Sequence, residues 1–130
     1  MTGIDTNVLV RFLAQDNPEQ ARKASRFLTR DCTAERPGFI NRIVLCELVW
    51  VLESAYGYPR EQVAMSLDMI LRTKQLAVED QPEAWLSLRE YREGADFADA
   101  FIAAVNRRRG CDRTLTFDRR AGRRSGFDLP

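Results

Sequence analysis

Residues 3–10 read Gly-Ile-Asp-Thr-Asn-Val-Leu-Val, which predicts a short strand that ends at an acidic residue and is followed by a helix. Three other acidic residues also stand in or beside apolar runs. The four are Asp5, Glu47, Asp99 and Asp118. An ionised carboxylate enclosed by apolar side chains neutralises, pairs or binds a cation. The four together therefore predict a cation site.

Short strands and amphipathic helices alternate along the chain. We expect strands at about residues 1–5, 39–40, 76–78 and 114–117, with an edge strand near residue 127. Helices are expected at about residues 8–13, 18–29, 42–56, 59–72, 82–93 and 97–109. Asn17 and Asn41 are expected N-caps, and Asn17 with Gln20 has the spacing of a capping box. Strands separated by helices predict an α/β fold with a parallel sheet covered on both faces.

Length and composition indicate one globular domain over residues 1–130, with 45% hydrophobic and 30% charged residues. No apolar run has the length of a membrane span and no signal peptide precedes the first strand, so we expect a cytoplasmic protein. Three cysteines without Cys-x-x-Cys spacing indicate reduced thiols. The absence of histidine excludes Ser-His-Asp and Cys-His catalysis and a His-ligated zinc site.

The predicted layout directs the acidic residues toward one edge of the sheet. Asp5 and Asp118 follow strands, and ligand sites form at the carboxyl ends of strands in open α/β sheets. Glu47 and Asp99 fall in the first two turns of helices that are expected to begin at the same edge. Repulsion among the four predicts at least one raised carboxyl pKa in the absence of metal. Ligands of this kind suit Mg²⁺ or Mn²⁺.

Four segments carry a resemblance to a known family: residues 4–11, 45–52, 96–103 and 114–118. In this order they resemble the successive motifs of PIN-domain nucleases, and more narrowly those of the VapC-type toxins of bacterial type II toxin–antitoxin systems. The resemblance covers nearly the whole chain. It implies a three-layer α/β/α fold with a short, mainly parallel central sheet and helices on both faces. Cys46 stands where a small residue such as alanine is common in the family.

The resemblance also implies an activity, that of a Mg²⁺- or Mn²⁺-dependent endoribonuclease. Its acidic positions match Asp5, Glu47, Asp99 and Asp118. The three aspartates would hold the metal directly or through water, and Glu47, which is also a possible ligand, would orient or deprotonate the attacking water. Asn7 and Thr116 match positions that hydrogen-bond within the acidic site.

Partners are implied by the same resemblance. The substrate would be tRNA or another RNA of translation, cut to leave a 5′-phosphate and a 3′-hydroxyl. The family implies a homodimer and a cognate antitoxin that blocks the acidic groove. Trp50, Leu52 and Tyr56 offer apolar contacts for such a protein, although Trp50 and Trp85 are first expected in the core.

Some of these residues also have a structural interpretation. Asp96 and Asp99 stand three positions apart at a helix start, so we expect Asp96 to be the N-cap and leave open whether it reaches the metal through water. The net charge is only +1, yet arginines crowd the C-terminal quarter. Those expected to bind the phosphates of RNA are Arg119, Arg120, Arg123 and Arg124.

Two other functions stay open. A PIN-like module that binds RNA or an antitoxin without catalysis has no need for four mutually repelling carboxylates. A phosphatase with Asp5 as nucleophile, in the haloacid-dehalogenase pattern, requires a second aspartate where Asn7 stands.

Overall fold

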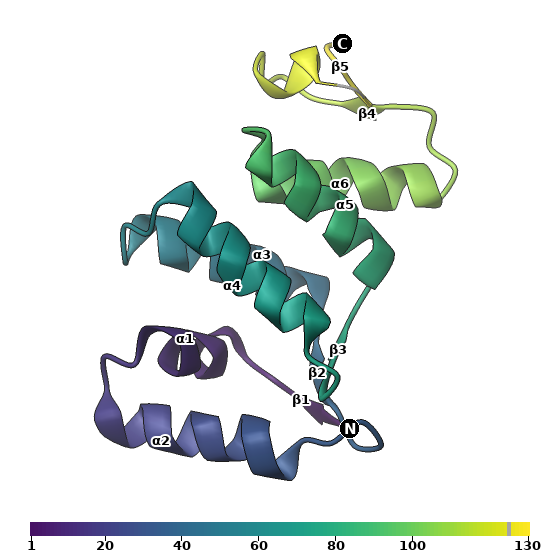
Figure 1. The fold of residues 1–130 in the computed structure, drawn as a ribbon. Coiled ribbons are helices and arrows are strands. Elements are labelled where there is room, and N and C mark those ends of the chain that lie inside the picture. The colour runs from purple at the N-terminus through teal and green to yellow at the C-terminus, as the bar shows by residue number, and fades with distance from the viewer. Residues whose placement is uncertain (125) are drawn as a thin grey trace. The chain divides into compact units, whose positions relative to one another are not determined.

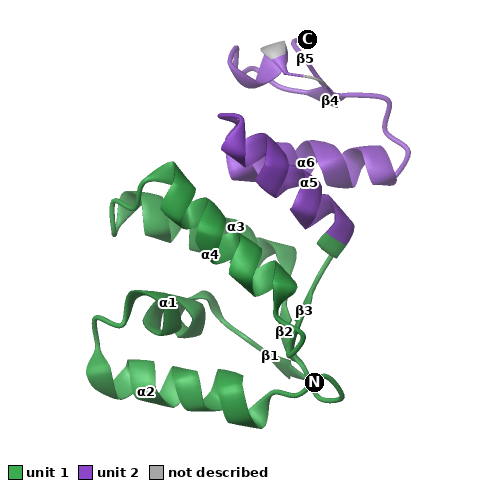
Figure 2. Cartoon of the chain, in the orientation of Figure 1, with its two compact units in different colours: residues 1–81 green, residues 82–130 purple. Residues whose placement is uncertain are grey.

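The structure is a computed structural model that describes residues 1–124 and 126–130, and the side chain of Arg123 lies outside that description. Short strands and helices alternate along the chain (Figure 1). Contacts divide the chain into two compact units, residues 1–81 (unit 1) and residues 82–130 (unit 2) (Figure 2). Helices and parallel strands occur in both units, which confirms the expected α/β class.

Unit 1 contains a parallel sheet of three short strands in the order β1-β2-β3. Its strands are β1 (Thr2–Gly3), β2 (Gly38–Ile40) and β3 (Leu76–Val78). Its helices are α1 (Thr6–Ala14), α2 (Pro18–Arg26), α3 (Arg42–Ser54) and α4 (Arg60–Arg72), with a π-helical turn, η1 (Phe27–Asp31), after α2. Thr2 pairs with Gly38, and Ile40 pairs with Val78. Such a sheet, with the helices, is consistent with a three-layer α/β/α fold.

Local sequence sets the helix starts in unit 1. Asn17 accepts the N–H of Gln20 at 3.1 Å and so caps α2, while Pro18 occupies the first helical position, where its missing N–H is harmless. The side chain of Gln20 accepts a hydrogen bond from Arg11 instead of returning to Asn17, so only half of the expected capping box forms. Asn41 caps α3 as expected, accepting a backbone N–H at 2.9 Å.

Helix α3 packs against α1 and α4 and fills much of the core of unit 1. Leu45, Leu48 and Leu52 recur on one face of α3 and are fully buried. The expectation that Leu52 contacts a partner protein is therefore wrong. Trp50 lies on the opposite face of α3 with 66% of its surface exposed, so its expected place in the core is wrong as well. Helical periodicity explains both results, because it assigns Trp50 and Leu52 to different faces.

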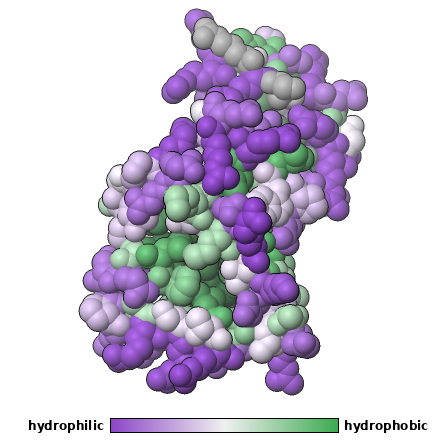
Figure 3. Space-filling model, viewed as in Figure 1, coloured by the Kyte–Doolittle hydropathy of each residue, from purple (hydrophilic) through white to green (hydrophobic). Residues whose placement is uncertain are grey.

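Apolar side chains also gather on the surface of unit 1 between α2 and α4 (Figure 3). They line a hollow of about 160 Å³ whose walls include Leu9, Phe12 and Met69. Among the described residues, no helix combines the length and the hydrophobicity that a membrane span needs.

Unit 2 begins within α5 (Gln81–Arg92) and continues through α6 (Phe97–Arg108), β4 (Thr114–Leu115), a 3₁₀ turn η2 (Ala121–Arg123) and β5 (Phe127–Asp128). Tyr91, Phe97 and Phe101 meet edge to face and join the end of α5 to α6. Trp85, expected in the core, is half-buried. Strands β4 and β5 pair in parallel as a second, two-stranded sheet. Ala103, Ala121 and Phe127 form a small core between α6, η2 and β5.

Candidate functional site

Asp5 stands where β1 gives way to α1. The N–H of Ile4 donates to the carbonyl of Phe39 at 2.9 Å, which holds the chain beside β2 just before the helix begins. Asp5 is then the N-cap of α1, and its Oδ1 accepts the N–H of Thr6 at 2.8 Å. One carboxylate oxygen therefore secures the helix start, and the negative charge lies at a helix N-terminus, where it is favoured.

Glu47 lies in the second turn of α3 and faces the same surface hollow as Asp5. This hollow, the acid pocket, has a volume of about 280 Å³. Its lining residues are Asp5, Thr6, Asn7, Val10, Arg11, Glu47, Val51 and Tyr56. The structure thus brings together two of the four acidic residues, with Asn7 beside them.

The acidic side chains are more exposed than the apolar segments around them in the sequence lead one to expect. Asp5, Glu47 and Asp118 are exposed, and Asp99 is half-buried. The expectation of enclosed carboxylates is therefore wrong for three of the four. Glu47 shows the reason: it shares the exposed face of α3 with Ile43 and Trp50, whereas its buried neighbours in the sequence lie on the other face. The argument for a cation then depends on how the carboxylates are grouped.

In unit 2, Asp99 lies within electrostatic reach of two other carboxylates, those of Asp96 and Asp118. Asp96 is the N-cap of α6, because its Oδ2 accepts the N–H of Asp99 at 3.0 Å, and the expected cap is confirmed. Burial raises the pKa of the Asp99 carboxyl above its ordinary value, and the negative charges of Asp96 and Asp118 raise it further, while Arg124 lowers it. At least one raised carboxyl pKa was predicted, and Asp99 has one, but its largest cause is burial rather than the predicted repulsion.

Asp118 follows β4 and organises the turn after it. Its Oδ1 accepts the N–H of Arg120 at 2.8 Å and that of Ala121 at 3.4 Å, and its own N–H donates to the hydroxyl of Thr116 at 3.0 Å. Strand β4 ends two residues earlier than expected, at Leu115, just before this turn. The neighbouring Arg119, Arg120 and Arg124 are exposed, and the side chain of Arg123 lies outside the described structure.

Two groups of carboxylates thus occur on an α/β chain. Asp5 and Glu47 form one in the acid pocket after β1, and the other lies at the start of α6 and in the turn after β4. The sequence profile of the PIN domain matches residues 4–126. The chain belongs to the PIN domain family. This match extends across both units. Comparison with curated proteins and with solved structures finds no significant match.

PIN domains are generally nucleases and typically use divalent metals such as Mg²⁺. The donors in this PIN domain fit such an ion in kind, since both groups offer carboxylate oxygen and the chain has no histidine. Within residues 1–124 and 126–130, no three His, Cys, Asp or Glu side chains lie close enough together to hold an ion.

Thr6 lines the acid pocket of this PIN domain, and sequence reasoning missed it. Thr6 is only 5% exposed, and its Oγ1 has no hydrogen-bond partner among the described residues. A buried polar atom without a partner is unfavourable by about 1–3 kcal/mol. The sequence does hold one signal for Thr6. Thr6 stands four residues before Val10 and so shares the inner face of α1, where an apolar residue rather than a threonine is expected.

Arg11 also escaped sequence reasoning, and it connects α1 to α2 and to the segment that follows α3. Its Nε donates to Gln20 Oε1 at 2.7 Å, and its Nη1 donates to Asp16 Oδ1 at 3.3 Å and to the Tyr56 hydroxyl at 3.2 Å. Tyr56 in turn donates to Asp16 Oδ2 at 2.7 Å, a bond that lowers the pKa of Asp16 and raises the pKa of Tyr56. This network holds α1 against the start of α2 and the segment after α3.

Proposed function

We propose that this PIN domain is a divalent-metal-dependent endoribonuclease and the toxin component of a VapC-type toxin–antitoxin pair. The observation that carries the proposal is the grouping of carboxylates: Asp5 with Glu47 in the acid pocket, and Asp99 with Asp118 in unit 2. Grouped carboxylates repel one another when both are ionised. A divalent cation offsets that repulsion.

In the proposed reaction, Asp5, Asp99 and Asp118 would hold the metal, with Glu47, or Asp96 through water, as a further ligand. Glu47 would orient or deprotonate the attacking water. Thr116 would help to position Asp118 by accepting its backbone N–H, and Asn7 would hydrogen-bond within the acid pocket. When bound, Mg²⁺ or Mn²⁺ lowers the pKa of water and neutralises charge on the phosphoryl oxygens.

The proposed substrate is tRNA or another RNA of translation, cut to leave a 5′-phosphate and a 3′-hydroxyl. With a net charge of +1, the chain must attract RNA through local cationic groups rather than through its overall charge. Arg119, Arg120 and Arg124 are exposed beside Asp118 and suit this role, which we extend to Arg123. The proposed partners are a second copy of the chain and an antitoxin in the cytoplasm, with the exposed ring of Trp50 and the half-buried ring of Tyr56 available for contact.

The direct test is cleavage of total RNA by the purified chain with Mg²⁺ or Mn²⁺ and with EDTA. Asp5→Asn and Asp99→Asn are expected to abolish cutting. Asn at position 5 keeps the start of α1 intact, because Asn is also a good N-cap, and the start of α6 is unaffected because its cap is Asp96. Asp112→Asn is the matched control, since it removes the same charge from an exposed position outside both groups. Cutting at the wild-type rate by both site variants would show that the carboxylates are not the active groups.

A second candidate is a PIN-like module that binds RNA or an antitoxin without cleaving RNA. The hydrogen bonds of Asp5, Asp96 and Asp118 favour it, because each accepts a backbone N–H and so has a structural role of its own. Metal-independent RNA binding by a well-folded chain that never cuts RNA would support this candidate. Hydrolysis of a small phosphomonoester without RNA cleavage would instead favour the phosphatase.

A further inference from the structure

A second pocket adjoins the acid pocket in unit 1 and has a different chemistry. It lies between α1 and α2 and has a volume of about 440 Å³, within the range of about 300–1,000 Å³ that ligand pockets show. Its lining residues are Asn7, Val8, Arg11, Gln20, Lys23 and Ala24. No carboxylate is among them. Because Asn7 and Arg11 line both pockets, the two share a wall.

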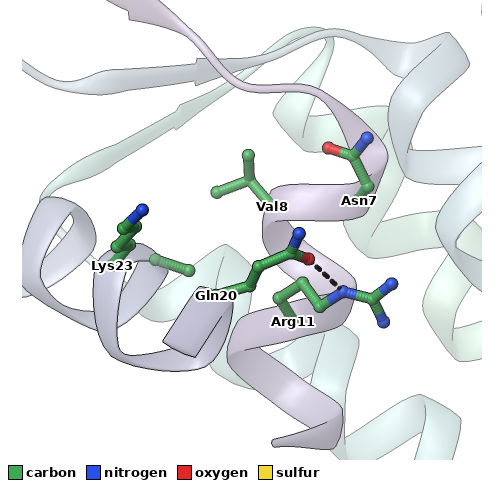
Figure 4. Close-up of a pocket in the computed structure, with 6 residues that line it drawn as sticks. Asn7, Val8, Arg11, Gln20 and Lys23 are labelled. Atoms are coloured by element: carbon green, nitrogen blue, oxygen red, sulfur yellow. Dashed lines mark hydrogen bonds between the residues drawn. The ribbon is translucent and has the colours of Figure 1, made fainter. Parts of the chain in front are cut away.

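The polar groups of this second pocket are mainly hydrogen-bond donors. The Gln20 oxygen accepts from Arg11, which leaves the Gln20 amide nitrogen directed away from Arg11 (Figure 4). Lys23 contributes an ammonium group with three donors and no acceptor, and Arg11 contributes a guanidinium group. Asn7 adds an amide. Such a set matches a ligand rich in acceptors, as phosphate oxygens and base carbonyls are.

Lys23 is the cation most available to a ligand. Lys23 Nζ lies 3.3 Å from Glu19 Oε1, and the two side chains of this ion pair are 73% and 70% exposed. Exposed pairs of this kind are weak and exchange readily with solvent. Arg11, by contrast, is held by Gln20, Asp16 and Tyr56 and forms a fixed wall.

We propose that the pocket between α1 and α2 binds the nucleotide that flanks the scissile phosphate of an RNA strand. Lys23 binds the phosphate of that nucleotide, Gln20 donates to acceptor atoms of its base, and Val8 and Ala24 form an apolar floor. This inference rests on the proposed ribonuclease function, because it takes the acid pocket next door as part of the cleavage site. It adds a binding subsite made of residues other than the arginines near Asp118.

The test compares Lys23→Ala with Arg22→Ala, which removes the same charge from the preceding residue of α2, outside the pocket. Binding of a single-stranded RNA is measured by fluorescence anisotropy in EDTA over a series of salt concentrations, so that no cleavage occurs. We expect Lys23→Ala to weaken binding about five-fold at low salt and to flatten the salt slope by about 0.7, the value for one phosphate contact on single strands. Arg22→Ala is expected to keep the wild-type slope.

Cleavage with Mg²⁺ is measured on the same proteins, and Gln20→Ala is expected to change the nucleotides found beside the cut ends. If wild-type protein cuts RNA while Lys23→Ala binds RNA as Arg22→Ala does, the subsite is overturned and the proposed function stands. If wild-type protein binds but never cuts, and Lys23→Ala still binds several-fold more weakly, the proposed function fails and the nucleotide site stands. Loss of poly-glutamate binding by Lys23→Ala, with RNA binding unchanged, would make an acidic protein segment the occupant and overturn the proposal.

Discussion

Replacing Thr6 by Val is expected to make the protein more stable and less active. Valine keeps the branched shape of threonine, so the packing of α1 is retained, while the buried hydroxyl without a partner is removed. Loss of such a group is favourable by about 1–3 kcal/mol. We take the lower end, about 1 kcal/mol, because Thr6 lies at the edge of the pocket rather than in the deep core. For a chain of this size, that corresponds to a rise in Tm of about 3–5 °C.

The measurement is thermal unfolding in EDTA, alongside RNA cleavage with Mg²⁺. Thr6→Ser is the matched control, since it keeps the hydroxyl and removes a buried methyl group, a loss of about 1 kcal/mol that lowers Tm. We expect the serine variant to retain cleavage and the valine variant to lose most of it, because only serine preserves an oxygen in the acid pocket. A lower Tm for Thr6→Val would mean that the hydroxyl has a partner within the folded chain. Undiminished cleavage would exclude it from the site.

Three further predictions concern charge and capping. Asp99→Asn is expected to raise the free energy of unfolding at neutral pH, and this gain should disappear on acidification. The raised pKa means that the carboxyl of Asp99 binds its proton more tightly in the folded chain than in the unfolded chain. The stability of the wild-type protein therefore falls as pH rises from about 3.8 through the folded-state pKa. Denaturant titrations at several pH values check this, and a gain independent of pH would contradict it. Replacing both Arg119 and Arg120 by Ala should flatten the salt slope of RNA binding by about 1.4, for two phosphate contacts, whereas an unchanged slope would assign both arginines to the solvated surface. Asn41→Ala should destabilise the protein by about 1 kcal/mol in urea unfolding through loss of the α3 cap, with Asn41→Asp nearly neutral.

Local signals in the sequence predicted the parts of this PIN domain that depend on near neighbours. The caps at Asn17, Asn41 and Asp96 each involve a backbone N–H three residues along, so spacing alone reveals them. Strand β3 was predicted with its observed bounds, Leu76–Val78. The ends of β1 and β4 were not, because Asp5 begins a helix cap and Thr116 begins a turn through side-chain hydrogen bonds that override strand propensity.

Features that depend on distant neighbours were beyond the sequence. An apolar segment around Glu47 does not reveal which face of α3 meets the core, and so the exposure of Glu47 and Trp50 was missed. The pocket between α1 and α2 joins residues on two helices, and nothing in the pattern of either helix pairs Arg11 with Gln20. Whether Asp5 and Glu47 act together with Asp99 and Asp118 stays a prediction.

The backbone hydrogen bonds of Asp5, Asp96 and Asp118 have a consequence for how such a protein changes over evolutionary time. Each side chain uses one oxygen to hold the chain in place, and an amide oxygen does this equally well. Exchanging a single oxygen for nitrogen would therefore remove a charge while every helix and turn is preserved. For the proposed nuclease, a single codon change would thus give a folded copy of the chain that lacks one of the charges its reaction requires.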